Sequence, residues 1–213
     1  MTLSLTGATV LVLAPHTDDG ELGAGGSIAR WTAEGNDVHY VGFSACETIQ
    51  PPDREPTILR TECAAATGAL GVPQENLRIL DFEVRHFARD RQAILDAMVH
   101  LNVSLRPDLV LLPSLDDTHQ DHEIVASEAR RAFKRTRLLG YEVPWNNFRF
   151  DVTSFVRLDS EHCERKWGAL QHFATQSGRP YMTREYVQSQ ARFRGVQAGC
   201  EFAEAFQVLR WYL

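Results

Sequence analysis

Short apolar runs alternate with stretches of helical patterning from the beginning of the chain. The strands predicted from them, of which the first and last contain only Val and Leu, cover residues 10–13, 38–43, 77–82 and 109–112. The helical patterns that follow them cover residues 26–34, 58–70, 91–105 and 123–134. Aliphatic runs of this length are typical of strands buried on both faces. The alternation therefore predicts an α/β fold, a Rossmann-like parallel sheet with right-handed crossovers and helices on both faces.

The second half of the chain continues without a break. Strands are expected at 138–143 and 150–156, and helices at 161–173 and 183–194. No repeat, low-complexity tract or long linker divides the sequence. We therefore expect a single domain over residues 1–213, a length that can bury a core without disulfides.

Composition narrows the class of protein. Hydrophobic residues make up 44% of the 213 residues and charged residues 23%, the balance of a folded, soluble chain. Asp and Glu outnumber Lys and Arg by 28 to 22, and the net charge of −6 argues against nucleic acid or anionic membranes as partners. No apolar run approaches the roughly 20 residues that span a bilayer, and the N-terminal segment resembles a strand more than a signal peptide. Four cysteines without a CxxC pair indicate reduced thiols and a cytoplasmic location.

Two polar clusters stand where the first and fourth predicted strands end. The first is Pro-His-Thr-Asp-Asp-Gly-Glu-Leu-Gly-Ala-Gly-Gly at 15–26, and the second is Pro-Ser-Leu-Asp-Asp-Thr-His-Gln-Asp-His at 113–122. Both combine imidazole with carboxylates a few residues beyond a strand exit. Ligands of open α/β sheets bind beyond the carboxyl ends of the strands, so both clusters are candidates for a functional site.

The first cluster allows three interpretations. Its glycines can cradle a phosphate before a helix, but Ile28 stands where the dinucleotide pattern GxGxxG needs its third glycine, and the adjacent acids would repel a pyrophosphate. The acids can instead cap a helix, with the glycines as close-packing positions, although two acids beside a histidine exceed what a cap needs. The third interpretation is a divalent metal site, because zinc takes imidazole and carboxylate ligands.

A metal site can be assembled from both clusters. His16 and Asp19 would supply two ligands from one turn, with Asp18 directed at a bound water. His119 and His122 are three residues apart and therefore fall on the same side of the chain. One of them can complete the ligand set while the other faces the substrate. Two imidazoles, one carboxylate and an open position form a hydrolytic arrangement.

With these motifs the chain resembles the PIG-L/LmbE-like zinc-dependent N-deacetylases. Their first motif, (P/A)HPDDE followed by LGxGG, corresponds to residues 15–20 and 22–26, and their second, DxHxDH, to residues 117–122. Arg-Thr-Glu at 60–62 and Arg-Pro-Asp at 106–108 support the same register. The resemblance implies the Rossmann-like fold of that family and removal of an N-acetyl group.

The resemblance also implies a role for each matched residue. The zinc ligands would be His16, Asp19 and His122. Asp18 would be the general base that takes a proton from the attacking water. His119 would face the scissile amide, where it stabilises the tetrahedral intermediate or protonates the leaving amine. The carboxylates that orient the histidines would be Asp117 and Asp121.

The chain departs from the family motif at two positions. Thr17 stands where the family has Pro, and Gly20 stands where it has Glu. Neither replaced residue is a ligand in the family, so the metal site is expected to survive. Gly20 removes a carboxylate beside the site, which bears on substrate fit or on the rigidity of the loop.

Further residues are candidates for binding substrate. Arg85 and His86 follow the third predicted strand, and the planar guanidinium of Arg85 suits a carboxylate, phosphate or hydroxyl as well as a structural salt bridge. Trp145, followed by two asparagines, is suited to stacking on a sugar or to a turn. The segment 179–186 is a candidate lid or pocket wall. Cys46 is expected to line the wall without acting as a nucleophile.

The sequence thus predicts a zinc-dependent hydrolase that removes an N-acetyl group from an amino sugar or sugar-like conjugate, releasing acetate and a free amine. One zinc ion per chain is expected, although imidazole and carboxylate also bind other divalent ions. A metal-dependent hydrolase of another amide or ester and a non-catalytic ligand-binding α/β domain stay open as alternatives. The expected partner is a small-molecule amino-sugar conjugate, and both a monomer and a homo-oligomer stay open.

Overall fold

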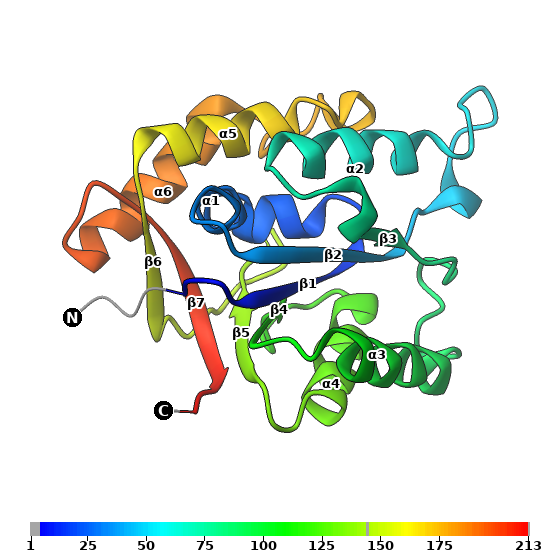
Figure 1. Cartoon of the computed structure of the whole chain (residues 1–213). Helices are drawn as coiled ribbons and strands as arrows, with labels where there is room; N and C mark the ends of the chain where they lie inside the picture. Colours follow the sequence, from blue (N-terminus) through cyan, green and yellow to red (C-terminus); the bar gives the residue numbers. More distant parts are fainter. Residues whose placement is uncertain (1–4, 144, 213) are drawn as a thin grey trace.

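A single seven-stranded sheet organises the computed structural model, which describes residues 5–143 and 145–212 (Figure 1). The order of the strands is β3-β2-β1-β4-β5-β7-β6. The strands are β1 (Thr9–His16), β2 (Asp37–Ser44), β3 (Leu77–Ile79), β4 (Leu109–Pro113), β5 (Arg137–Tyr141), β6 (Ser154–Leu158) and β7 (Phe202–Arg210). Strands β1 to β5 pair in parallel, so the predicted Rossmann-like α/β fold is confirmed.

Helices cover both faces of the sheet, as the alternating pattern predicts. The helices are α1 (Asp19–Ala33), α2 (Ile58–Ala69), α3 (Arg91–Leu105), α4 (Gln120–Ala132), α5 (Ser160–Leu170) and α6 (Arg184–Ala198). In Figure 1, α1, α2, α5 and α6 lie on one side of the sheet, whereas α3 and α4 lie on the other. Among the described residues, no helix is long and apolar enough to cross a membrane.

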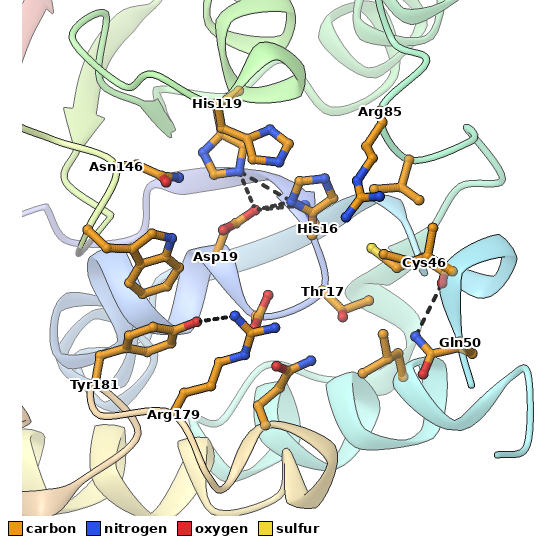
Figure 2. A pocket seen from close by; sticks show the side chains of 17 residues that line it. His16, Thr17, Asp19, Cys46, Gln50, Arg85, His119, Asn146, Arg179 and Tyr181 are labelled. Atoms are coloured by element: carbon orange, nitrogen blue, oxygen red, sulfur yellow. Dashed lines mark hydrogen bonds and ion pairs between the residues drawn. The ribbon is translucent and has the colours of Figure 1, made fainter. Parts of the chain in front are cut away.

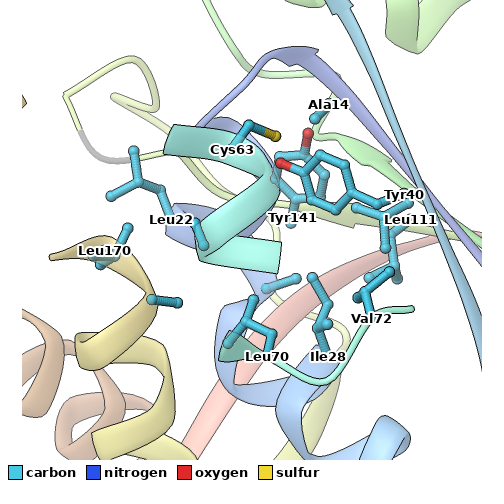
Figure 3. Close-up of a cluster of buried hydrophobic side chains, with 14 of the residues drawn as sticks. Ala14, Leu22, Ile28, Tyr40, Cys63, Leu70, Val72, Leu111, Tyr141 and Leu170 are labelled. Carbon is cyan, nitrogen blue, oxygen red and sulfur yellow. The ribbon is translucent and has the colours of Figure 1, made fainter. Parts of the chain in front are cut away.

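The central strand β1 is buried because its alternate side chains enter two different hydrophobic cores. Val10 and Val12 pack in the core beneath α1, α2 and α5, part of which is drawn in Figure 3. Leu11 and Leu13 pack in the second core, against α3 and α4. All four are fully buried, and each contributes roughly 1.5–3 kcal/mol by leaving water. An uninterrupted Val and Leu run is therefore what this position in the sheet requires.

The last strand, β7, is absent from the sequence-based expectations. It pairs antiparallel with both β5 and β6 and so inserts between them. Glu204 lies in the middle of β7 yet is buried, and a charged residue inside the segment breaks the alternation by which a strand is recognised. The edge of the sheet beyond β5 is thus completed by the C-terminal segment of the chain.

Helix α1 begins earlier than predicted. The glycine-rich segment that precedes the predicted helix at 26–34 is its first part, and the backbone leaves helical geometry at Ala24, where φ is −142°. A side chain at Gly23 would collide with the ring of Tyr141 in β5. The glycines therefore allow the helix to lie directly on the sheet, in agreement with the close-packing role that was one interpretation of them.

A buried ion pair stabilises the kink of α1. Glu204 accepts hydrogen bonds from the backbone N–H groups of Gly26 and Ser27, at 3.0 and 2.7 Å, and so caps the part of the helix beyond the kink. Lys166 of α5 lies 2.7 Å from the same carboxylate and donates to the carbonyl oxygen of Leu22 at 2.8 Å. This pair joins α1, α5 and β7.

Removal of the Glu204 charge is expected to destabilise the whole fold. Glu204→Gln leaves the Lys166 ammonium buried without its counter-charge, which costs about 3–5 kcal/mol of the free energy of unfolding. The matched control is Glu201→Gln, because Glu201 is the exposed partner of Arg192 and its loss costs under about 1 kcal/mol. Urea unfolding of both variants measures the difference. Equal losses would show that the buried pair has no special weight.

Candidate metal centre

The site lies where β1 and β4 end side by side. These strands are neighbours in the middle of the sheet and run in parallel, so the residues that follow them leave at the same edge. His16 is the last residue of β1, and α4 begins a few residues after β4 with His119 as its N-cap. The helix expected from residue 123 thus starts at Gln120, which places His122 in its first turn. Both predicted clusters meet at this edge.

Three candidate ligand atoms converge there (Figure 2). His16 Nδ1 and His122 Nε2 lie 3.2 and 3.1 Å from the same oxygen of Asp19, and the two nitrogens are 3.3 Å apart. Ligands placed tetrahedrally at the zinc distances of about 2.0–2.2 Å are separated by roughly 3.3–3.5 Å. The spacing of these three atoms therefore fits the ligand set predicted from the sequence.

Each of the two histidines is oriented by a carboxylate on its other nitrogen. His16 Nε2 lies 3.0 Å from Asp121, and His122 Nδ1 lies 2.7 Å from Asp117. Both acids are buried. Imidazoles that bind metal are commonly held by carboxylates in this way, which fixes the ring and makes the free nitrogen a better ligand. The geometry supports the orienting role expected for the two acids.

His119 lies beside this group in a different setting. Its Nδ1 accepts a hydrogen bond from the backbone N–H of Asp121 at 3.1 Å, so that Nε2 carries the proton of the neutral ring. One nitrogen from each of His16, His119 and His122 can be chosen so that all lie within 4.8 Å of one another, which makes the three imidazoles an alternative ligand set. Burial, followed by the neighbouring His122 and His16, lowers the pKa of His119 to about 4.

The charges of the cluster compensate one another. Burial lowers the pKa of His16, but hydrogen bonds to Asp121 and Asp19 outweigh it and raise that pKa to about 9. Burial also lowers the pKa of His122, but the charge of Asp19 and the hydrogen bonds to Asp117 and Asp19 outweigh it and raise that pKa to about 10. Without an ion, protons on the imidazoles balance the carboxylates, and a divalent cation would take over that balance. The donor set is therefore electrostatically suited to a cation.

Asp18 borders the same cavity but is not shared between the histidines. Burial is the main cause that raises its pKa to about 6, and the adjacent charge of Asp19 adds to it. A carboxylate with a pKa close to neutrality is suited to accept and release a proton, which agrees with the base expected here.

The cavity in front of these residues has a volume of about 240 Å³. Of the residues predicted to bind substrate, Arg85 and Trp145 line it. His86 does not: its half-exposed ring lies 3.7 Å from Glu83. Cys46 lines the wall as expected, and burial raises the pKa of its thiol to about 12, which keeps it protonated.

The cavity is also lined by residues that the sequence did not single out individually. Arg179 and Tyr181 come from the segment treated as a candidate lid or wall, and both line the cavity. Gln50 and Gln176 were not anticipated. No pattern around these glutamines in the sequence distinguishes them from surface residues, because they reach the cavity only through the folding of loops.

The departure at Gly20 is explained by Tyr40. A side chain at Gly20 would collide with the Tyr40 ring, whose hydroxyl accepts a hydrogen bond from the Gly20 N–H at 3.2 Å. The same hydroxyl bonds to Glu21, which is fully buried and whose pKa burial raises well above its usual value. A phenol beneath the turn thus occupies the space that a side chain at position 20 would need.

The fold and this donor set define an α/β protein with a candidate divalent-metal site at the carboxyl edge of a parallel sheet. Comparison with known families identifies the group more narrowly. The chain belongs to the PIG-L family, because the model of that family, described as GlcNAc-PI de-N-acetylase, matches residues 11–133. This range contains both polar clusters and the strands that position them.

Solved structures share the same architecture over nearly the whole chain. The conserved protein TT1542 from Thermus thermophilus is 26% identical, with a TM-score of 0.81, over 97% of this chain and 96% of that one. N,N'-diacetylchitobiose deacetylase from Pyrococcus horikoshii is 19% identical, with a TM-score of 0.76, over 95% and 84%. The 4-carboxy-2-hydroxymuconate hydratase GalB from Pseudomonas putida is 22% identical, with a TM-score of 0.81, over 97% and 98%.

Zinc binding near pH 7 is expected to release protons. In the metal-free protein His16 and His122 hold protons up to about pH 9 and 10, and a ligating nitrogen must lose its proton. The affinity for zinc will therefore fall as the pH is lowered. Titration calorimetry in buffers of different ionisation enthalpy counts the protons released. An affinity that does not change between about pH 6 and 9 would contradict this electrostatic description.

Proposed function

We propose that the protein is a metal-dependent N-deacetylase that releases acetate from an N-acetylated amino sugar or a sugar-like conjugate. The observation that carries the proposal is the set of three candidate ligand atoms with mutual separations of 3.1–3.3 Å, contributed by His16, Asp19 and His122. Asp18 and His119 line the same cavity. Membership of the PIG-L family and the deacetylase among the similar structures support this activity.

The metal would be held by His16, Asp19 and His122, as the donor spacing permits. A divalent ion at that position supplies Lewis acidity and lowers the pKa of a coordinated water. Zinc is the proposed ion, since imidazole and carboxylate are among its usual ligands. Asp117 and Asp121 keep the two imidazoles in place for it.

Asp18 would take a proton from the attacking water. Its pKa of about 6 leaves the carboxylate ionised near neutrality while keeping it basic enough to accept a proton. The water attacks the carbonyl carbon of the acetamide, after which the C–N bond breaks. The nitrogen of the departing amine needs a proton at that point.

His119 is placed to serve this second half of the reaction. Because Nδ1 is occupied by the Asp121 N–H, Nε2–H is the group left to donate. The ring is partly exposed and lines the cavity, so substrate can reach it. A hydrogen bond from Nε2 would stabilise the developing oxyanion or assist the leaving amine.

The direct experiment measures acetate release from a panel of N-acetylglucosamine conjugates, with the metal content determined on the same sample. Acetate formation that disappears on chelation and returns with zinc is the expected result. Metal binding without acetate release from any member would favour another amide or an ester as the substrate. Absence of bound metal together with tight nucleotide binding would instead favour a non-catalytic α/β domain.

Two substitutions separate the base from the ligands. Asp18→Asn is expected to keep the metal and to lose turnover by a factor of about 10²–10⁴, the usual contribution of a general base. His122→Ala is expected to lose the metal as well as turnover. Metal analysis and acetate release on the two variants provide the measurement. Turnover at the wild-type rate in Asp18→Asn would exclude this residue as the base.

A third substitution decides between the two ligand sets. If His119 acts on the substrate, His119→Gln retains the metal at the wild-type stoichiometry and lowers kcat by roughly 10²-fold or more. If all three imidazoles hold the ion, the variant loses metal affinity to the same extent as His122→Ala. Metal titration of the two variants under one set of conditions compares them directly.

Addition of water to an unsaturated carboxylic acid is a second candidate reaction. GalB, which is named as a hydratase, has this fold, and the cavity here contains the guanidiniums of Arg85 and Arg179, which suit carboxylates. Incubation with 4-carboxy-2-hydroxymuconate, followed by ultraviolet absorbance, tests it. Loss of the conjugated absorbance without any acetate release in the sugar panel would favour hydration.

A cytoplasmic location accompanies the proposal. It is supported by the four cysteines, which are all free, three of them buried. Thiols of this kind are typical of a reducing compartment.

A further inference from the structure

Helix α2 contacts both of the loops that line the cavity. The first wall loop, residues 45–57, joins β2 to α2, and the second wall loop, residues 171–183, joins α5 to α6. The side chains that these loops place in the cavity are Cys46, Ile49 and Gln50 from the first, and Gln176, Arg179 and Tyr181 from the second (Figure 2). Arg60 and Glu62, from the Arg-Thr-Glu segment near the start of α2, do not line the cavity themselves. Their side chains connect the helix to the two loops.

Glu62 holds the second wall loop. Its buried carboxylate accepts hydrogen bonds from the backbone N–H of Thr175 at 3.0 Å and from the Thr175 hydroxyl at 2.6 Å. Within the described residues Glu62 forms no ion pair, so these neutral donors satisfy a carboxylate whose burial would otherwise be costly. Thr175 directly precedes Gln176 in the short 3₁₀ helix Ala174–Gln176. Both oxygens of a buried acid are thus used to fix one residue of a cavity wall.

No other hydrogen bond joins the middle of this loop to the rest of the described chain. Phe173 and Tyr181 are buried in the core at its two ends, but residues 174–180 are exposed or half-buried. The remaining hydrogen bonds of this stretch stay within the loop, like the one from Arg179 to Tyr181. Exposed segments with few buried contacts open locally more readily than packed helices do. The position of the stretch therefore depends on Glu62.

Arg60 holds the first wall loop in a similar way. Its Nε donates to Glu47 of that loop at 2.6 Å. The other two nitrogens bond to the chain at the end of β3, Nη1 to the carbonyl oxygen of Ile79 at 3.0 Å and Nη2 to Asp81. The planar guanidinium donates in fixed directions, which suits a contact with several partners at once. Arg60 thus joins the first wall loop to the end of β3.

The helix itself is a rigid support for these contacts. Leu59, Cys63, Ala66 and Leu70 bury one face of α2 in the core that it shares with α1 and α5. The first wall loop, by contrast, contains a strained residue, Cys46 with a φ of +54°. A backbone conformation of this kind persists only where the surroundings enforce it. A well-packed helix can therefore fix loops that do not fix themselves.

We propose that Arg60 and Glu62 are positioning residues that fix the two wall loops to α2 and so set the shape in which the cavity receives its substrate. The inference rests on the proposed deacetylation for the reaction that it affects. Within the described structure, neither residue bonds to Asp18, His119 or the candidate metal ligands. Contacts that the loops make equally with substrate and transition state change KM and leave kcat unaltered. Substrate binding, and not the chemical step, is therefore expected to depend on the two residues.

Two substitutions at Glu62 test the hydrogen bonds to the second wall loop. Glu62→Met removes both acceptors and is expected to raise KM about tenfold, because ordering two loosened wall side chains on binding costs roughly that factor. The value of kcat is expected to stay within about twofold. Glu62→Gln can accept from the Thr175 N–H and donate to its hydroxyl, so KM is expected to stay within about twofold of the wild type. Both constants are measured on the N-acetylglucosamine conjugate that releases acetate fastest.

Arg60→Met tests the first wall loop and is also expected to raise KM. Its control is Arg30→Met, since Arg30 likewise bonds to a carboxylate and a backbone carbonyl oxygen but lies in α1 outside the cavity. Hydrogen–deuterium exchange distinguishes the loops, because Glu62→Met is expected to speed exchange in residues 171–183 alone and Arg60→Met in residues 45–57 alone. Arg30→Met is expected to change neither.

Leu101→Ala controls for a general loss of stability. Leu101 of α3 is buried in the second core, on the other face of the sheet, so its truncation destabilises the fold without touching either loop. Its KM and the exchange of both loops are expected to match the wild type. A merely structural role of Glu62 would make Glu62→Met and Leu101→Ala alike.

The outcomes separate this inference from the proposed function. A wild-type KM in Glu62→Met, a rise shared by Leu101→Ala, or exchange that is unchanged or not confined to the matching loop would overturn the positioning role even if acetate is released. Faster exchange of the matching loop alone, with wild-type exchange in Glu62→Gln, would support it even if no conjugate is deacetylated. In that case the deacetylase proposal alone would fail.

Discussion

The adjacency of β1 and β4 is the constraint on which the candidate site depends. Both strands are buried in the middle of a parallel sheet, so their carboxyl ends open at one edge and the chain must leave the sheet there. His16 leaves from one strand and His122 from the helix that follows the other. Two segments more than a hundred residues apart in sequence are thereby brought to within 3.3 Å between imidazole nitrogens.

The candidate ligands and the acids behind them are stable at this depth because their charges are paired. Asp19 is shared by two imidazoles, and Asp117 and Asp121 each hold one of them from behind. An unpaired carboxylate at this depth would be strongly unfavourable. The same arrangement leaves one nitrogen of each imidazole directed at a common point, where a cation can bind. The stability of the cluster and its suitability for a metal therefore have one electrostatic origin.

Packing beneath the cluster is equally specific. The first part of α1 approaches the sheet so closely that a side chain at Gly23 would collide with Tyr141. The part of the helix beyond the kink is capped by Glu204. Glu204 belongs to β7, a strand that forms no part of the predicted parallel sheet. The kinked helix that follows Asp18 is thus held by a side chain of the C-terminal strand.

The apolar runs and the two polar clusters, visible in the sequence, determined the five parallel strands and the candidate ligands. They could do so because buried parallel strands require continuous aliphatic runs and because ligands collect at strand ends. The sequence could not place β7, since the buried Glu204 resembles a surface residue until Lys166 is seen beside it. Nor could the sequence show that Arg85 and Arg179 line the same cavity or that His86 does not. Loops and strained backbone angles decide where those side chains lie. Local pattern thus determined the framework and its chemistry, whereas contacts between distant segments decided the shape and charge of the cavity.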